Sequence, residues 1–170
     1  MKKMKDFAKF CRNQIKVHQT FSSIGGLLMP SIGHIVLAKE VMKSNETEEV
    51  ILVEPFSVLT TDVFPFEPKF TVNIGVFSLK RGVTYQLAYF LYSPRGEKII
   101  GNIADIQATE DATKEYGVDF NLSVNIGEVK FAEPGVYSFR FQIVTLHEEK
   151  STFFLVKPNE QENHEGEKHE

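Results

Sequence analysis

The chain has 170 residues, of which 42% are hydrophobic and 25% charged, a balance typical of one soluble globular domain. This composition excludes a collagen-like or wholly disordered chain, and the sequence contains no apolar run near the ~20 residues that a membrane-spanning helix needs. Fifteen Phe and five Tyr supply enough apolar surface for a core without metals or disulfides. The net charge of −4 is unevenly distributed along the chain, so it argues for no particular partner.

The N-terminal segment is basic, and its sequence leaves the secondary structure open. Met4, Phe7, Cys11 and Ile15 recur at helical spacing, whereas the β-branched residues that follow favour strands, so residues 2–16 fit either a helix or a strand. The basic side chains of this segment are a candidate binding site for nucleic acid, an anionic membrane or an acidic partner. They are Lys2, Lys3, Lys5, Lys9, Arg12 and Lys16.

Cysteine content and the first residues favour a cytoplasmic protein. Cys11 is the single cysteine and cannot close an internal disulfide, which fits a reducing compartment. The basic start is similar to the first part of a signal peptide, but polar residues such as Lys9 and Arg12 interrupt the apolar region that would have to follow.

The next part of the chain changes from ambiguous signals to strong β signals. Pro30 and Gly33 predict a turn or crossing, and residues 34–43 fit either a helix of about three turns or a strand. Further on, residues 50–53 and 56–61 are predicted strands. Two prolines then fix an extended linker at residues 64–69, because the residue before each proline is pushed toward extended geometry.

The middle of the chain predicts antiparallel hairpins with proline and glycine turns. The segment from Tyr85 to Tyr92 is apolar on both faces apart from Gln86, so we expect a central, covered strand there. A polar stretch at residues 105–116 contains several carboxylates without the spacing of a calcium loop, and a polar connection is the favoured interpretation. The predicted elements are a strand at 70–79, a turn at 80–82, a strand at 85–92, a turn at 93–96 and a returning strand from 98.

The last strands show the clearest alternation of apolar and polar residues. Residues 120–126 and 137–144 each place apolar side chains at every second position, which is typical of a sheet with one buried face, and the second strand is expected to run from Tyr137 to Leu146. A four-residue loop at 147–150 is expected to lead into a strand at 151–156. Short strands with turns at roughly ten-residue spacing predict an all-β fold, a single antiparallel β-sandwich with at most one short helix. The predicted domain covers residues 1–157, and the Glu-rich residues 158–170 are predicted to be a disordered acidic tail.

A series of short motifs is arranged in the order typical of one family. These are Phe7-Ala-Lys-Phe-Cys11, Ser22-Ser-Ile-Gly-Gly26, Phe64-Pro65, Ser93-Pro-Arg-Gly96 and Phe131-Ala-Glu-Pro-Gly-Val-Tyr-Ser-Phe139. In this order the chain resembles a bacterial and phage-borne family of domains of unknown function, over about three quarters of its length. The resemblance implies an immunoglobulin-like β-sandwich and a strand at residues 7–11. It implies no activity.

Sequence motifs for catalysis, metals or phosphate are weak throughout. Cys11 with His18 or His34 would form a nucleophile and base only if the fold brought them together, and a buried core cysteine is the favoured interpretation. The histidines lack metal-site spacing, and Gly25-Gly26 is followed by no phosphate-loop pattern, so a bend is expected there. The tyrosines at positions 85, 89 and 92 would suit a stacking platform for single-stranded nucleic acid, but their apolar neighbours favour core packing.

The leading functional hypothesis from the sequence is a non-enzymatic β-sandwich that acts by protein binding, as a homo-oligomer or in a larger assembly such as phage-encoded machinery. Nucleic-acid binding through the basic N-terminal segment is the first alternative, and a small enzyme with an unrecognised site is the second. We expect no cofactor, no metal and no catalytic residue, and the sequence identifies no small-molecule ligand.

Overall fold

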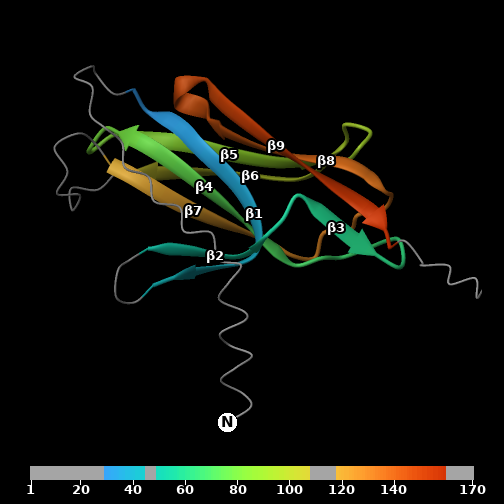
Figure 1. The fold of residues 1–170 in the computed structure, drawn as a ribbon. Helices are drawn as coiled ribbons and strands as arrows, with labels where there is room; N and C mark the ends of the chain where they lie inside the picture. Colours follow the sequence, from blue (N-terminus) through green and yellow to red (C-terminus); the bar gives the residue numbers. More distant parts are fainter. Residues whose placement is uncertain (1–28, 45–48, 108–117, 160–170) are drawn as a thin grey trace, which may run out of the picture.

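The computed structural model describes residues 29–44, 49–107 and 118–159. These residues form strands and one short 3-10 helix, and the strands are arranged in two sheets that pack face to face (Figure 1). The elements are β1 (Ser31–Lys43), β2 (Val50–Pro55), β3 (Val58–Thr61), β4 (Phe70–Leu79), β5 (Thr84–Tyr92), β6 (Lys98–Gln107), β7 (Val118–Ile126), β8 (Gly135–Ile143), η2 (Val144–Leu146) and β9 (Glu148–Pro158). The prediction of an all-β sandwich is confirmed, and within the described ranges η2 is the one short helix.

The inner strands of the two sheets pair as they do in an immunoglobulin-like sandwich. Sheet A has the order β2-β1-β4-β7, and sheet B has the order β3-β9-β8-β5-β6. All neighbouring strands are antiparallel except β3 and β9, which are parallel. The pairing of β4 with β7 in one sheet, and of β5, β8 and β9 in the other, matches the two-sheet connectivity of immunoglobulin domains.

Alternating side chains of the two sheets meet in an aromatic core. On β8, Tyr137, Phe139, Phe141 and Ile143 are all buried, as their period-two pattern predicts. Around Phe131, which is fully buried, ring contacts join both sheets at centroid distances of 4.7 Å to Tyr137, 6.0 Å to Phe154 and 6.3 Å to Phe70. Such edge-on and tilted pairs are the arrangements that aromatic quadrupoles favour.

The corner before β8 is fixed by the hydroxyl of Tyr137. This hydroxyl donates a hydrogen bond of 2.7 Å to the backbone carbonyl of Glu133, four residues upstream. The same contact characterises the tyrosine corner of immunoglobulin domains. Burial raises the pKa of the Tyr137 phenol; the hydrogen bond to Glu133 lowers it, and the nearby Glu133 carboxylate raises it again.

Two predictions of local structure are wrong. Gly33 lies within β1 at a β-bulge between Ile32 and His34, where a turn or crossing was expected. The loop before the last strand lies at residues 144–147, because β8 ends at Ile143, η2 follows, and β9 already begins at Glu148. His147 adopts a left-handed conformation with φ of 55°, which ends the 3-10 turn.

In other segments the structure decides between the predicted alternatives or shows a strand longer than predicted. Residues 34–43, which fitted helix or strand, are part of β1. The strand from Lys98 continues to Gln107 and so includes the first three residues of the stretch expected to be a polar connection. β9 runs to Pro158, and Asn159 donates its backbone N–H to the carbonyl of Thr61 at 2.9 Å. The remainder of the predicted acidic tail lies outside the described residues.

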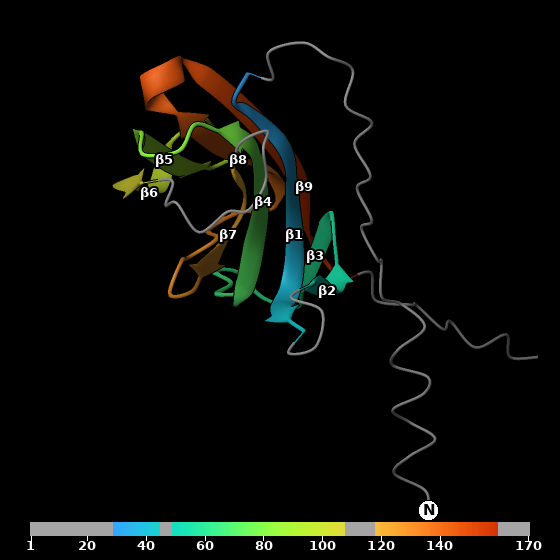
Figure 2. The same ribbon diagram turned by 90° about the vertical axis from the view of Figure 1, so that its left-hand side faces the viewer.

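The two sides of the sandwich differ in how the sheets meet. On one side β1 lies next to β9, and the Lys150 ammonium donates to the Gly33 carbonyl at 2.6 Å while a Glu148 oxygen accepts from the Ile32 N–H at 3.4 Å. These side chains occupy the edge of β1 that β2 does not cover. Figure 2 shows β6 and β7 on the opposite side of the sandwich, each as the last strand of its sheet.

Candidate functional site

The basic residues predicted to bind a partner lie outside the described part of the chain. This applies to Lys2, Lys3, Lys5, Lys9, Arg12 and Lys16, and also to Cys11, His18 and the Gly25-Gly26 bend. Of the stretch at 105–116, the structure describes only residues 105–107, which belong to β6. The binding role of these residues stays a prediction.

The three tyrosines of β5 do not form one platform. Tyr85 is buried, and its hydroxyl accepts the Lys80 N–H at 2.9 Å, while Tyr89 packs on the core and stacks on Phe139 at 5.8 Å. Core packing is therefore confirmed for these two. It is wrong for Tyr92, which points to the outer face of sheet B because the strand alternates.

The outer face of sheet B carries half-buried aromatic rings that contact cations. The guanidinium carbon of Arg140 lies 5.0 Å from the Tyr92 ring centroid, and the Lys98 ammonium lies 5.6 Å from the Phe90 ring centroid. The Phe90 ring also covers Gly101 of β6, since a Cβ at that glycine would lie 2.5 Å from the ring. The rings are thus partly covered by cations and by backbone, which explains how they lie on an outer face.

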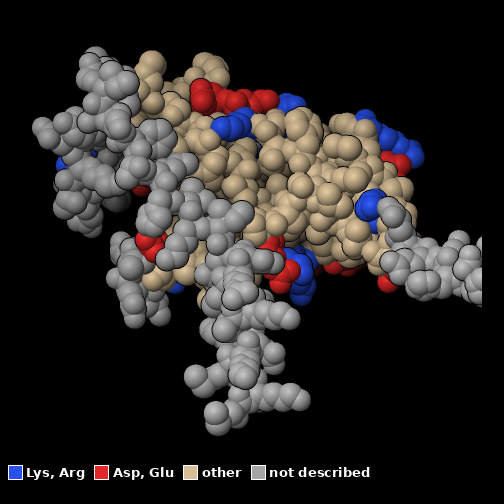
Figure 3. All heavy atoms as spheres, in the orientation of Figure 1, with Lys and Arg blue, Asp and Glu red and all other residues tan. Residues whose placement is uncertain are grey.

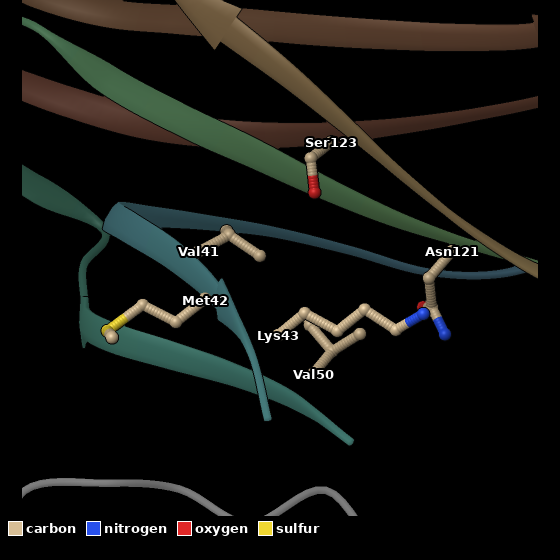
Figure 4. A pocket seen from close by; sticks show the side chains of 6 residues that line it. All are labelled: Val41, Met42, Lys43, Val50, Asn121 and Ser123. Carbon is tan, nitrogen blue, oxygen red and sulfur yellow. The ribbon is translucent and has the colours of Figure 1, made fainter. Parts of the chain in front are cut away.

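Sheet A has a cavity of about 330 Å³ between the β1–β2 hairpin and β7 (Figure 4). Val41, Met42, Lys43 and Val50 line it from the hairpin, and Asn121 and Ser123 line it from β7. In Figure 4 the Lys43 side chain points toward Asn121. The lining offers an ammonium group, an amide and a hydroxyl, which suits hydrogen bonding to a small polar group, and these six side chains include no carboxylate or imidazole beside the hydroxyl.

A polar pair lies on the outer face of the same sheet. The Nε2–H of His34 donates to Oδ1 of Asn73 at 2.8 Å, and the His34 ring covers Gly75, where a Cβ would lie 2.3 Å from the ring. Asn73 is 1% exposed; its Nδ2 and the His34 Nδ1 are buried and have no hydrogen-bond partner among the described atoms. His34 therefore contacts an amide, which is not a nucleophile.

Charged side chains are sparse on the face of sheet A that Figure 3 presents and gather at its rim. The register explains this, because the outward positions along the centre of β4 and β7 are neutral, and Asp119 lies near the start of β7. The neutral positions are Thr71, Asn73 and Gly75 on β4, and Asn121, Ser123 and Asn125 on β7. This face offers hydrogen-bonding groups without a strong field.

Among the long strands that the structure describes, β6, the last strand of sheet B, has exposed residues at most of its positions. Its ten residues pair with β5 from Lys98 to Gln107, and no strand among the described residues pairs with its other edge. Exposed positions include the whole run from Gly101 to Asp105, and Ile103 is 56% exposed. An unpaired edge of this kind presents N–H and C=O groups to an added strand.

Hydrogen bonds show which residues of β6 direct their backbone outward. The Ile103 N–H is donated to Oδ1 of Asn102 at 2.9 Å, and on β5 the Gln86 N–H is donated toward the β8 side, to Oγ1 of Thr145 at 2.8 Å. In an antiparallel pair the backbone groups alternate in direction. Both bonds therefore place Gly101, Ile103 and Asp105 on the open edge of the sheet.

The sequence pattern does not predict this edge. It indicates only the start of β6, and from residue 105 onward it favours a polar connection. Ile103 has neutral and acidic neighbours, so this part of the strand gives little apolar signal. The isoleucines that recur between Ile99 and Ile106 are the signal that could have indicated a longer strand.

The comparisons with known proteins leave the family open. No family model matches the chain, and no curated protein matches it. Within the described ranges, no group of three or more His, Cys, Asp or Glu side chains is placed to hold a metal ion, and no helix is long and apolar enough to cross a membrane.

Proposed function

We propose that this protein is a protein-binding or assembly module, and that it binds through the open edge of β6 rather than acting as an enzyme. The observation that carries the proposal is the ten-residue strand whose outward backbone groups, at Gly101, Ile103 and Asp105, face no strand of the described chain. Strand addition at such an edge uses main-chain hydrogen bonds for affinity and side chains of the added strand for specificity.

The composition of this edge is that of a strand open to binding and not of one protected against pairing with other chains. Edge strands are commonly protected by lysine or proline in mid-strand. The run from Ile99 to Ala104 contains neither, and the charged residues of β6 lie toward its ends, at Lys98 and Asp105. A partner strand would therefore meet neutral and apolar positions along the centre of β6.

The expected cellular setting follows from the sequence. A single cysteine is in keeping with a cytoplasmic protein, and the resemblance to a bacterial and phage-borne family is in keeping with a role in an assembly of that origin. Nucleic-acid binding by the basic N-terminal residues is the competing hypothesis, and the two differ in their salt dependence.

Affinity capture of the full-length protein from a lysate of its own cells, at low and at high salt, tests the proposal. Ile103→Lys places a charge on the open edge, and Val136→Lys places the same charge on the same sheet face but on the interior strand β8, where the exposed fraction is 53%. We expect a protein partner that resists salt, is lost with the Ile103 variant and is kept with the Val136 variant.

Two results would contradict this expectation. A partner retained equally by all three proteins would show that the edge of β6 is not the binding surface. Nucleic acid alone, released at high salt, would favour the basic N-terminal segment instead.

A further inference from the structure

We infer that the strand added to β6 is β6 of a second copy of this chain, so that two B sheets join across a two-fold axis into one continuous antiparallel sheet. This inference rests on the proposed binding role of the edge and names its partner. It also specifies a register, in which Gly101 faces Ile103 of the second copy and Asn102 lies on the axis.

Among the four outermost strands, β6 is the best suited to self-pairing. β3 has four residues, and β2 has six, of which Glu54 has a positive φ of 46° and Pro55 lacks an N–H. β7 has nine residues, but its charged residue is Asp119, so two copies of β7 would bring no opposite charges together. β6 alone of the four combines ten residues with one positive and one negative side chain.

The charges of β6 are complementary in the proposed register. A bulge near Ile99 shifts the alternation, so Lys98 points to the same outer face as Gly101, Ile103 and Asp105. With Gly101 opposite Ile103 of the second copy, Asp105 arrives opposite this bulge and next to Lys98 of that copy. The two-fold axis repeats the contact, which gives two cross-strand ion pairs. In the alternative register, with Ile103 opposite itself, Asp105 faces Gly101 and gains no cation.

The apolar contacts of the edge favour the same register. Ile103, which is 56% exposed, would lie opposite a glycine, and the Phe90 ring of the second copy already covers that glycine. The isoleucine of each copy therefore packs against an aromatic ring of the other, a favourable cross-strand pair. Each pair of Gly101 and Ile103 can exchange two backbone hydrogen bonds, about four in all across the axis.

One contact must open for the strands to join. In the single chain, Oδ1 of Asn102 accepts the hydrogen bond from the outward N–H of Ile103. The Asn102 side chain has to rotate away before this N–H can bond to a second strand. Because Asn102 is exposed, water can replace this bond at little cost, and the released N–H then bonds to the Gly101 carbonyl of the second copy.

Sedimentation of the full-length chain over a range of concentrations up to about 1 mM measures the association, since a single edge pairing is smaller than a standard interface and is expected to be weak. The mass should rise from 19.4 kDa toward that of a dimer. Lys98→Glu and Asp105→Lys each turn both ion pairs into like-charge pairs and should weaken the dimer about tenfold. The double variant restores opposite charges and should recover the association.

The single and double charge variants distinguish a loss of strand pairing from damage to the fold. Both residues are exposed, so circular dichroism and thermal unfolding of the variants should match the unchanged chain. A double variant that associates as weakly as the two single variants would overturn the register.

Disulfide trapping provides a second measurement. With Cys11→Ser as background, Asn102→Cys should form a covalent dimer under mild oxidation, because the two residues face each other on the axis within disulfide distance. Val136→Cys is the matched control and should stay monomeric. Trapping through Ile103→Cys but not through Asn102→Cys would overturn the register.

The inference and the proposed function can fail separately. A chain that remains monomeric at every concentration overturns the second copy as partner, whereas lysate capture that depends on Ile103 would still support protein binding. A chain that stays monomeric and whose lysate capture does not depend on Ile103 would overturn both the inference and the proposed function.

Discussion

Truncating Phe139 should destabilise the fold far more than truncating Phe153, although the two side chains lie on neighbouring strands of sheet B. Phe139 is fully buried and stacks on Tyr89, whereas Phe153 is 64% exposed on the outer face. Removing a buried Phe leaves a cavity and costs about 3–5 kcal/mol. For Phe153 only about a third of the burial energy of a Phe is at risk, roughly 0.5–1 kcal/mol.

Urea unfolding of the full-length variants measures this difference. The midpoint should fall sharply for Phe139→Ala and slightly for Phe153→Ala, with an unchanged slope if both still unfold in two states. Ser138→Ala, which changes the adjacent outward position, should be nearly silent. Similar losses at all three positions would refute the assignment of faces, because they would mean that β8 does not direct alternate side chains into the core.

Two further perturbations test the turn before β8. Tyr137→Phe removes the hydrogen bond to the Glu133 carbonyl and should cost about 1–2 kcal/mol in urea unfolding. Because the pKa of Tyr137 is raised by folding, stability should fall as the pH rises above the ordinary value of 10.0, and the Phe variant should lose that part of the slope. Gly135→Ala should cost about 1–3 kcal/mol, since φ is 144° and the new Cβ would lie 2.7 Å from Pro94. Gly127→Ala, with no atom within 4 Å of its Cβ, is the control and should lie within about 0.5 kcal/mol of the unchanged chain.

The strands that sequence predicts well are those whose two faces differ. β4 has the predicted bounds of 70–79, and the inward positions of β8 follow the predicted alternation. In such strands each apolar residue is placed by the same physical constraint, burial on one face, so a period of two is visible without knowledge of the fold.

Prediction fails where a strand ends although the residues that follow it are still apolar. Val144 and Leu146 are apolar like the buried residues of β8 before them, yet they form the 3-10 turn, and the polar residues from Glu148 that suggested a loop already belong to β9. What moves the turn is the left-handed backbone at His147 and the pairing of Glu148 with Ile143. Neither feature can be predicted from residue type alone, because both depend on the register in which β9 pairs with β8.

The candidate binding edge is hard to predict for a related reason. Binding by strand addition depends on main-chain groups, which every residue carries, so the sequence of β6 need not contain a motif. Pattern analysis finds strands that bury one face, whereas β6 is exposed at most of its positions and gains its order from pairing with β5. The same exposure that hides the strand from sequence analysis leaves Gly101, Ile103 and Asp105 open to a second strand. The candidate edge is therefore visible in the topology of the described strands, which leaves the outer edge of β6 unpaired, and not in its residue types.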